Sequence, residues 1–164
     1  MAEQQNDGSF RPTLRAKLWS RTLDKRPASA GMYLEDDEGR LLVVKAHYKK
    51  HWSLPGGIID KGEMPLVAAL REVKEEVGLT IPAESATFRS VIARRSKLFN
   101  SYQFVFAAPL AAGQISEIKL QASEITEYAL VTKDQVRAKD RHYGRVIHDW
   151  AKGTSGYREQ ELDG

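Results

Sequence analysis

The sequence contains no cysteine among its 164 residues. Disulfide bonds, thiolate metal ligands and a catalytic thiol are therefore excluded. The chain also has no apolar run of about 18 residues, the length that a membrane-spanning helix needs. Residues Met1–Gly8 are polar and lack the apolar stretch of a secretory signal. We therefore expect a cytoplasmic protein that does not enter a membrane.

The composition is that of a folded domain with an uneven charge distribution. Hydrophobic residues make up 41% of the chain and charged residues 29%, which fits one globular domain with its own core. The net charge is +3, but residues 57–79 hold five acids against three bases. Residues 11–26 and 89–97 are strongly basic. The basic excess favours an anionic partner, and the acidic segment needs a separate explanation.

Periodicity and turn residues predict a layered α+β domain. Strands are expected at residues 30–34, 40–46, 87–94, 101–108 and 128–132, and helices at residues 65–77, 134–138 and 143–151. The predicted organisation is a flexible basic arm (residues 1–26), one domain (residues 27–152) and a tail (residues 153–164). The arm is interpreted as a docking helix or as a direct contact to ligand or nucleic acid.

The clearest helix covers residues 65–77. Pro65 suits the first helical position, and Gly78 suits the position just beyond the end. An apolar stripe that must face the core is formed by Leu66, Leu70, Val73 and Val77. On the same helical wheel, three glutamates lie within about 100° of one another and are centred nearly opposite this stripe: Glu72, Glu75 and Glu76.

Three carboxylates within one turn repel one another, at about 0.2–0.5 kcal/mol for a pair such as Glu72 and Glu76. Arg71 can neutralise one of them, best Glu75 at i+4. The remaining charge indicates a cation, and oxygen ligands alone favour Mg²⁺ or Mn²⁺. The spacing by itself also fits an acidic face in solvent.

The surrounding residues resemble the Nudix box. In that motif a glycine is followed after five residues by a glutamate and after seven more by R-E-apolar-x-E-E-x-G-apolar, and Gly57, Glu63 and Arg71–Leu79 match every defining position. The preceding Trp52–Gly56 is similar to the usual lead-in. The chain is identified on these residues as a member of the Nudix hydrolase family. The resemblance implies an α/β/α sandwich with a mixed central sheet.

The resemblance also implies a reaction, the metal-dependent hydrolysis of a pyrophosphate bond in a nucleoside diphosphate linked to another moiety. Mg²⁺ or Mn²⁺ would be bound by the three helix glutamates, with the carbonyl group of Gly56 as a further ligand. Glu63 either binds metal through water or caps the helix. Glu124 either joins the site from a later loop, in preference to Glu127, or lies exposed in that loop.

One box carboxylate should activate the attacking water. Glu75 is favoured, with Arg71 fixing its orientation, and Glu72 is second. Members of the family differ in this assignment, so the resemblance leaves both open.

The substrate is expected to contact a basic segment between two strands. Arg94, Arg95 and Lys97 are the candidates for binding phosphate, and Phe99 or Tyr33 for stacking on a base, although either aromatic side chain could simply be packed. The expected partner is a small nucleotide. RNA 5′ ends and a non-catalytic nucleotide sensor are the alternatives, and the resemblance allows a homodimer.

Overall fold

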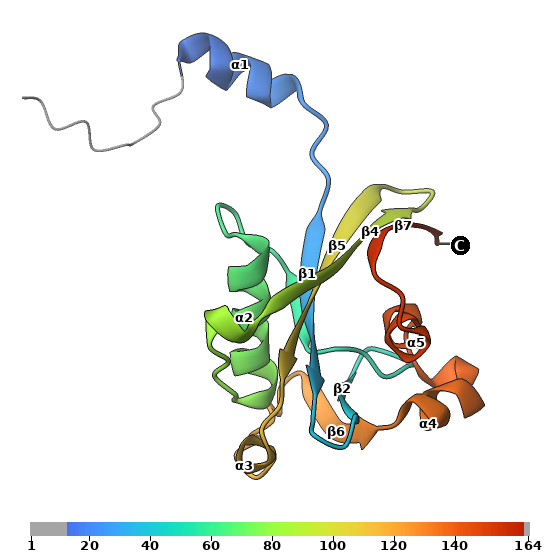
Figure 1. Cartoon of the computed structure of the whole chain (residues 1–164). Helices are drawn as coiled ribbons and strands as arrows, with labels where there is room; N and C mark the ends of the chain where they lie inside the picture. The colour runs from blue at the N-terminus through green and yellow to red at the C-terminus, as the bar shows by residue number, and fades with distance from the viewer. Residues whose placement is uncertain (1–12, 163–164) are drawn as a thin grey trace, which may run out of the picture.

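A mixed β-sheet forms the centre of the structure, a computed structural model that describes residues 13–162 (Figure 1). The strands are β1 (Ala28–Glu35), β2 (Leu41–Ala46), β3 (Gly56–Ile58), β4 (Thr87–Arg95), β5 (Asn100–Pro109), β6 (Ile125–Val131) and β7 (Gly156–Glu161). Their order is β6-β2-β1-β5-β4-β7, and β3 pairs with β1 outside this path. The pairs β1–β5 and β4–β7 are parallel, and the other pairs are antiparallel.

Helices lie on both faces of the sheet. The helices of the structure are α1 (Leu14–Thr22), α2 (Pro65–Val77), α3 (Ala112–Ile115), α4 (Lys133–Ala138) and α5 (Arg145–Lys152). Of these, α1 projects away from the sheet and covers neither face. Figure 1 shows α2 on one face and α4 and α5 on the other. The expected α/β/α sandwich with a mixed sheet is therefore confirmed. Among residues 13–162, no helix is long and apolar enough to cross a membrane.

Alternation along the strands divides the buried residues between two cores. On β1, Met32 and Leu34 pack in the core that α2 covers, whereas Tyr33 between them packs in the core under α4 and α5. On β2, Leu42 and Val43 are divided in the same way. Successive side chains of a strand point to opposite faces, so a strand buried on both faces shows the continuous apolar run that the sequence has here.

The helix α2 has the predicted bounds. Pro65 occupies its first position, and Gly78 ends it with φ 75°, donating its backbone N–H to the carbonyl of Lys74. Val73 and Val77 are fully buried, and Leu66 packs against the same core at its edge. The glycine is needed at this end because the left-handed conformation is costly for residues with a Cβ.

Two strands are not among the elements that the sequence predicts. Residues 156–161 form β7 instead of part of a tail, pairing in parallel with β4. Gly56–Ile58 form the short strand β3 against β1. Neither strand contains a buried residue, so neither shows the apolar pattern of a core strand.

The basic arm is described only from residue 13 onward. Thr13 caps α1 by accepting a hydrogen bond from the backbone N–H of Ala16, and α1 contains no buried residue. A helix is present in the arm, but it is not docked on the domain, and its role stays a prediction. The rest of the predicted arm, residues 1–12, lies outside the described part of the chain.

Candidate functional site

Arg71 on α2 connects the acidic residues of the site. Its guanidinium donates to Glu63 at 2.9 and 3.0 Å, to Glu72 at 2.8 Å and to Glu75 at 3.0 Å. A further bond of 3.1 Å reaches the carbonyl of Ile58 on β3. These carboxylates raise the pKa of Arg71, which therefore stays charged. The predicted contact with Glu75 is present, and the same guanidinium also orients Glu72 and Glu63.

Glu63 is held by this network instead of capping α2. Its carboxylate accepts hydrogen bonds from Arg71 and from the backbone N–H of Asp60 at 2.9 Å, and Met64 at the N-cap has no side-chain cap bond. The hydrogen bond from Arg71, followed by that from Asp60, lowers the pKa of Glu63. The capping alternative is therefore not what the structure shows.

Glu76 lies on the buried side of α2, with only 3% of its surface exposed. Its carboxylate accepts a hydrogen bond of 2.9 Å from the backbone N–H of Gly56. Burial raises the pKa of Glu76 to about 7, against the opposing effects of the Gly56 hydrogen bond and of Lys49. The burial of Glu76 was not predicted, because the helical wheel could not show that β3 approaches this side of α2.

Two successive glycines make that approach possible. Gly56 has φ 154°, and a Cβ there would lie 2.4 Å from the carbonyl oxygen of Ala30 on β1. A Cβ on Gly57 would lie 2.3 Å from Oε1 of Glu72. Only residues without a side chain fit between β1 and the carboxylates of α2, so β3 can supply backbone groups to the site.

A cavity of about 290 Å³, here called the acidic cavity, contains most of the predicted metal ligands. Its lining includes Gly56, Glu72, Glu76 and Glu124. Burial raises the pKa of Glu72, and the charges of Glu75 and Glu124 add to this, against the effect of Arg71. Glu75 itself is half exposed and does not line the cavity.

The donors of the acidic cavity fit a hard divalent cation. They are carboxylate oxygens close enough to repel one another, beside a backbone whose glycines leave room for an ion. Within residues 13–162, no group of three or more His, Asp or Glu side chains is arranged so that it could hold a metal ion. In this arrangement Arg71 donates to Glu72, and the backbone N–H of Gly56 donates to Glu76.

Glu124 is an exposed residue from the later part of the chain that lies at the acidic cavity. It directly precedes β6 and lines the acidic cavity, whereas Glu127 lies within β6 opposite Lys45. The preference for Glu124 over Glu127 therefore agrees with the geometry.

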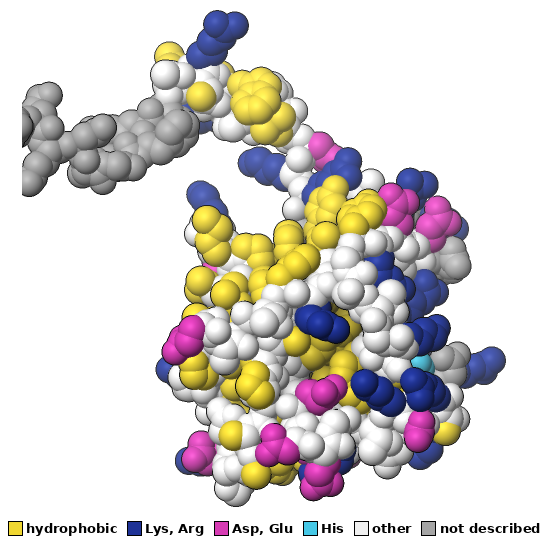
Figure 2. All heavy atoms as spheres, viewed as in Figure 1, with side chains coloured by type: hydrophobic (Ala, Val, Ile, Leu, Met, Phe, Trp, Pro, Cys, Tyr) yellow, Lys and Arg dark blue, Asp and Glu magenta, His cyan; other side chains and the backbone are white. Residues whose placement is uncertain are grey.

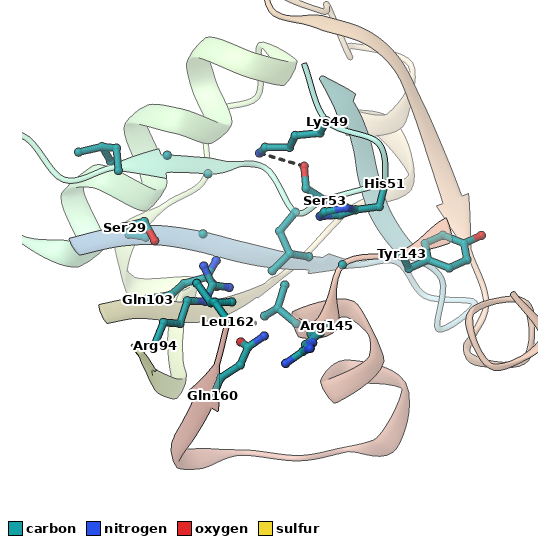
Figure 3. A pocket seen from close by; sticks show the side chains of 18 of the residues that line it. Ser29, Lys49, His51, Ser53, Arg94, Gln103, Tyr143, Arg145, Gln160 and Leu162 are labelled. Atoms are coloured by element: carbon teal, nitrogen blue, oxygen red, sulfur yellow. Dashed lines mark hydrogen bonds between the residues drawn. The ribbon is translucent and has the colours of Figure 1, made fainter. Parts of the chain in front are cut away.

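A larger cavity of about 660 Å³, here called the basic cavity, adjoins the acidic one (Figure 3). Tyr48 and the three residues of β3 line both. The cationic side chains in its lining are Lys49, Arg94, Arg141 and Arg145, and no Asp or Glu is among its described lining residues. A substrate with a phosphate group in the acidic cavity can therefore extend into a basic one.

Of the predicted substrate contacts, Arg94 lines the basic cavity and the others do not. Arg95 is exposed and pairs with Glu161 at 3.4 Å, and Lys97 lies at the β4–β5 turn. Phe99 lies at the same turn and is 55% exposed. Arg95 follows Arg94 directly on β4, so its side chain points to the other side of the strand. Lys97 and Phe99 lie beyond β4, in the turn.

Tyr33 cannot stack on a substrate. It is 3% exposed, and its hydroxyl donates a 2.7 Å hydrogen bond to the carbonyl of Val146 on α5. Burial raises its pKa, which is consistent with a hydroxyl that stays protonated in the core. The stacking prediction for Tyr33 is therefore wrong.

Several residues that line the basic cavity could not be predicted from the sequence. Gln103 on β5, Gln160 on β7 and Arg145 at the start of α5 converge there from distant segments (Figure 3). None belongs to a motif, so only the tertiary structure could bring them into one site. The loop at residues 47–51, by contrast, stands out in the sequence as basic.

Comparison with known proteins decides the family. A family model described as NUDIX domain matches residues 25–151. The chain belongs to the Nudix family. Solved Nudix-type structures agree with the fold: the MutT protein of Methanosarcina mazei aligns with a TM-score of 0.64 and 20% identity, over 80% of this chain and 95% of that one. A Caenorhabditis elegans Ap4A hydrolase aligns with a TM-score of 0.62 and 22% identity, over 77% and 93%.

Curated relatives of this Nudix chain are similar over shorter stretches. A Xenopus laevis protein named nucleoside diphosphate-linked moiety X motif 6 is 37% identical over 70 residues, 42% of this chain and 30% of the relative. A Streptomyces ambofaciens MutT-like protein is 27% identical over 107 residues, 65% and 64% of the two chains. An RNA pyrophosphohydrolase of a Psychrobacter species is 44% identical over 52 residues, 32% and 30%. The chain thus covers less than two thirds of each of these relatives.

Proposed function

We propose that this Nudix chain hydrolyses a pyrophosphate bond in a nucleoside diphosphate linked to another moiety, with Mg²⁺ or Mn²⁺. The observation that carries the proposal is the acidic cavity, where Glu72, Glu76 and Glu124 lie beside the backbone of β3. A basic cavity continues from it. The carboxylates of the acidic cavity can bind a cation, and the neighbouring cationic side chains of the basic cavity can bind phosphate. This combination suits a substrate of this class.

The residues of the acidic cavity are assigned the binding of the ion. Glu72, Glu76 and Glu124 supply carboxylate oxygens, and Gly56 a backbone oxygen. Glu75, at the exposed margin of the acidic cavity, is the remaining glutamate of the Nudix box that could bind the ion. A divalent ion bound there neutralises charge on the pyrophosphate and holds the reacting oxygens in place. Arg71 keeps Glu72 and Glu75 oriented from the other side.

The cavity favours Glu72 over Glu75 as the group that takes a proton from the attacking water. A base must lie within hydrogen-bond reach of that water. Glu72 lines the cavity, whereas Glu75 is at its exposed margin. We therefore prefer Glu72 here, whereas the sequence favoured Glu75, and both residues remain candidates.

A hydrolysis screen tests the proposal. Purified protein is incubated with Mg²⁺ or Mn²⁺ and with nucleoside triphosphates, ADP-ribose, dinucleoside polyphosphates and nucleotide sugars, and the products are separated by chromatography. We expect turnover of one class, reduced about 10²- to 10⁴-fold in Glu72→Gln. Glu127→Gln, which removes an exposed strand carboxylate outside the cavity, should keep full activity.

The outcomes separate enzyme from sensor. If no substrate turns over, and nucleotide binding is the same in Glu72→Gln, the hydrolase proposal is wrong. A sensor is the remaining function in that case. A solved Nudix domain of this fold, from Shewanella oneidensis NrtR, is in complex with ADP-ribose (TM-score 0.61, 16% identity).

Triphosphorylated RNA 5′ ends are the second candidate substrate. The name of the Psychrobacter relative and the cationic lining of the basic cavity favour it. The screen therefore includes a 5′-triphosphorylated RNA, with its binding measured between 50 and 200 mM salt. An RNA substrate predicts a steep loss of affinity over this range, because several phosphate contacts release counterions.

A further inference from the structure

The basic cavity is lined by several cationic side chains, which binding of an uncharged part of a substrate would not explain. Its lining includes Lys49, Arg94, Arg141 and Arg145 without an acidic residue among the described ones. The first turn of α5 also lines it, and Gly144 at the N-cap offers no side chain to bond the free N–H groups. A helix N-terminus adds further positive potential for an anion.

Arg94 in particular forms no ion pair among the described residues. Its guanidinium donates to the amide oxygen of Gln103, which is neutral. Its Nε is buried and has no hydrogen-bond partner in the described part of the chain. Burial lowers the pKa of Arg94 against the opposing charge of Asp149, and the neighbouring Arg145 lowers it further. A phosphate in the cavity would give this guanidinium an anionic hydrogen-bond partner.

The strand β7 completes this part of the cavity. Gln160 lies opposite Arg94 in the β4–β7 pairing and, like Leu162, lines the cavity (Figure 3). β7 is tied to α5 by an ion pair between Arg158 and Asp149 and by the bond from Arg145 to the carbonyl of Glu161. This strand lies beyond residues 25–151, the part of the chain that the family model matches.

We propose that the basic cavity is a second anion subsite, which selects substrates with at least one phosphate beyond the bond that is cleaved. Arg94 binds that phosphate, the start of α5 and Arg145 add positive charge, and Gln160 on β7 helps to orient it. The substrate class rests on the proposed hydrolase function, whereas the anion subsite can be tested without turnover. Nucleoside triphosphates, dinucleoside polyphosphates and triphosphorylated ends belong to this class. ADP-ribose, with only the two phosphates flanking the cleaved bond, does not.

The subsite is tested first by binding alone. Inorganic pyrophosphate is titrated calorimetrically into the full chain in EDTA, so that no divalent ion contributes. We expect Arg94→Gln to weaken binding about tenfold or more, and the matched control Arg95→Gln less than twofold. Arg95 carries the same charge on the same strand but is exposed outside the basic cavity. Equal losses in both variants, or none in Arg94→Gln, would overturn the proposal.

Selection is tested second, by comparing kcat/KM for diadenosine tetraphosphate and ADP-ribose with Mg²⁺. We expect the wild type to prefer diadenosine tetraphosphate, and Arg94→Gln and Gln160→Ala to reduce this preference, mainly through KM. Gln160→Ala serves as the second variant, since it removes no charge. A wild type that prefers ADP-ribose would refute the selection. Pyrophosphate binding without any turnover would instead refute the hydrolase function and leave the subsite intact.

Discussion

Gly57 is the residue where a single added methyl group would reach the carboxylate of Glu72. A Cβ there would lie 2.3 Å from Oε1, so Gly57→Ala must displace that side chain. We expect kcat/KM to fall about 10- to 100-fold, because small misplacements of reacting groups are costly. Steady-state kinetics and circular dichroism together would separate this loss from unfolding.

The matched control is Gly113→Ala in α3, where the added Cβ would have nothing within 4 Å. This variant should keep wild-type kinetics. Equal kinetics in Gly57→Ala and the wild type would show that Glu72 does not need its observed position.

Asp36, at the turn between β1 and β2, predicts a pH dependence of stability. Burial alone would raise its pKa, but hydrogen bonds from the backbone and side chain of Arg40 outweigh this, so the pKa is lowered from 3.8. A carboxyl with a lowered folded pKa stabilises the protein above its unfolded pKa, and this contribution disappears as pH falls through the folded value.

We therefore expect Asp36→Asn to lower the free energy of unfolding by about 1–3 kcal/mol at pH 7. The difference from wild type should shrink below about pH 4. Urea denaturation at several pH values measures both. Asp37→Asn, at the exposed neighbouring position, should change stability little. A difference for Asp36→Asn that is constant down to pH 2 would contradict the assignment.

At the scale of elements, α2 combines a packed face with the acidic residues of the site. Val73 is fully buried against the sheet, whereas Val67 on the same helix is 55% exposed. We expect Val73→Ala to cost about 1.5–3 kcal/mol of unfolding free energy, from lost burial and the cavity left behind. Val67→Ala should change it by less than about 0.5 kcal/mol. Urea denaturation of the pair is the measurement, and equal costs would show that α2 does not pack as described.

The edge strand β7 is stabilised by different interactions from those that stabilise the central strands. It has no buried residue, and its pattern alternates between exposed and half-buried side chains. Its position depends on pairing with β4 and on the ion pair of Arg158 with Asp149. Such a strand is stabilised by contacts with distant segments, which local propensity does not contain.

At the scale of the whole molecule, the acidic cavity predicts that a divalent ion stabilises the fold. An ion that binds only the folded state adds about 2.7 kcal/mol at 100 times its dissociation constant. We therefore expect Mg²⁺ to raise Tm in a concentration-dependent way and EDTA to reverse the rise. Glu76→Gln should abolish the rise, whereas Glu127→Gln should keep it. An equal rise in both variants would place the ion elsewhere.

The two cavities also give the molecule a charge polarity. Figure 2 shows Lys and Arg side chains gathered on the side where Figure 1 places α5 and β7. The acidic residues of the box are confined to α2 and its neighbours. A net charge of +3 therefore understates the positive potential that a phosphate-rich ligand meets as it approaches the basic side.

The sequence by itself determined the family, the layered fold and the limits of α2. Each depends on local information: the spacing of the box, continuous apolar runs in β1 and β2, and the Pro65 and Gly78 signals at the helix ends. The predicted roles of the box glutamates and of Glu124 remain to be tested by the variants above.

Only the tertiary structure decided which residues share a cavity. It placed Tyr33 in the core, brought Arg94 beside Gln160 and Arg145, and turned an expected tail into β7. The reason is physical: strand alternation fixes only two faces, whereas the pairing of distant strands fixes which side chains meet on them. Glu76 is the clearest case, because its burial depends on two glycines twenty residues away that let β3 reach α2.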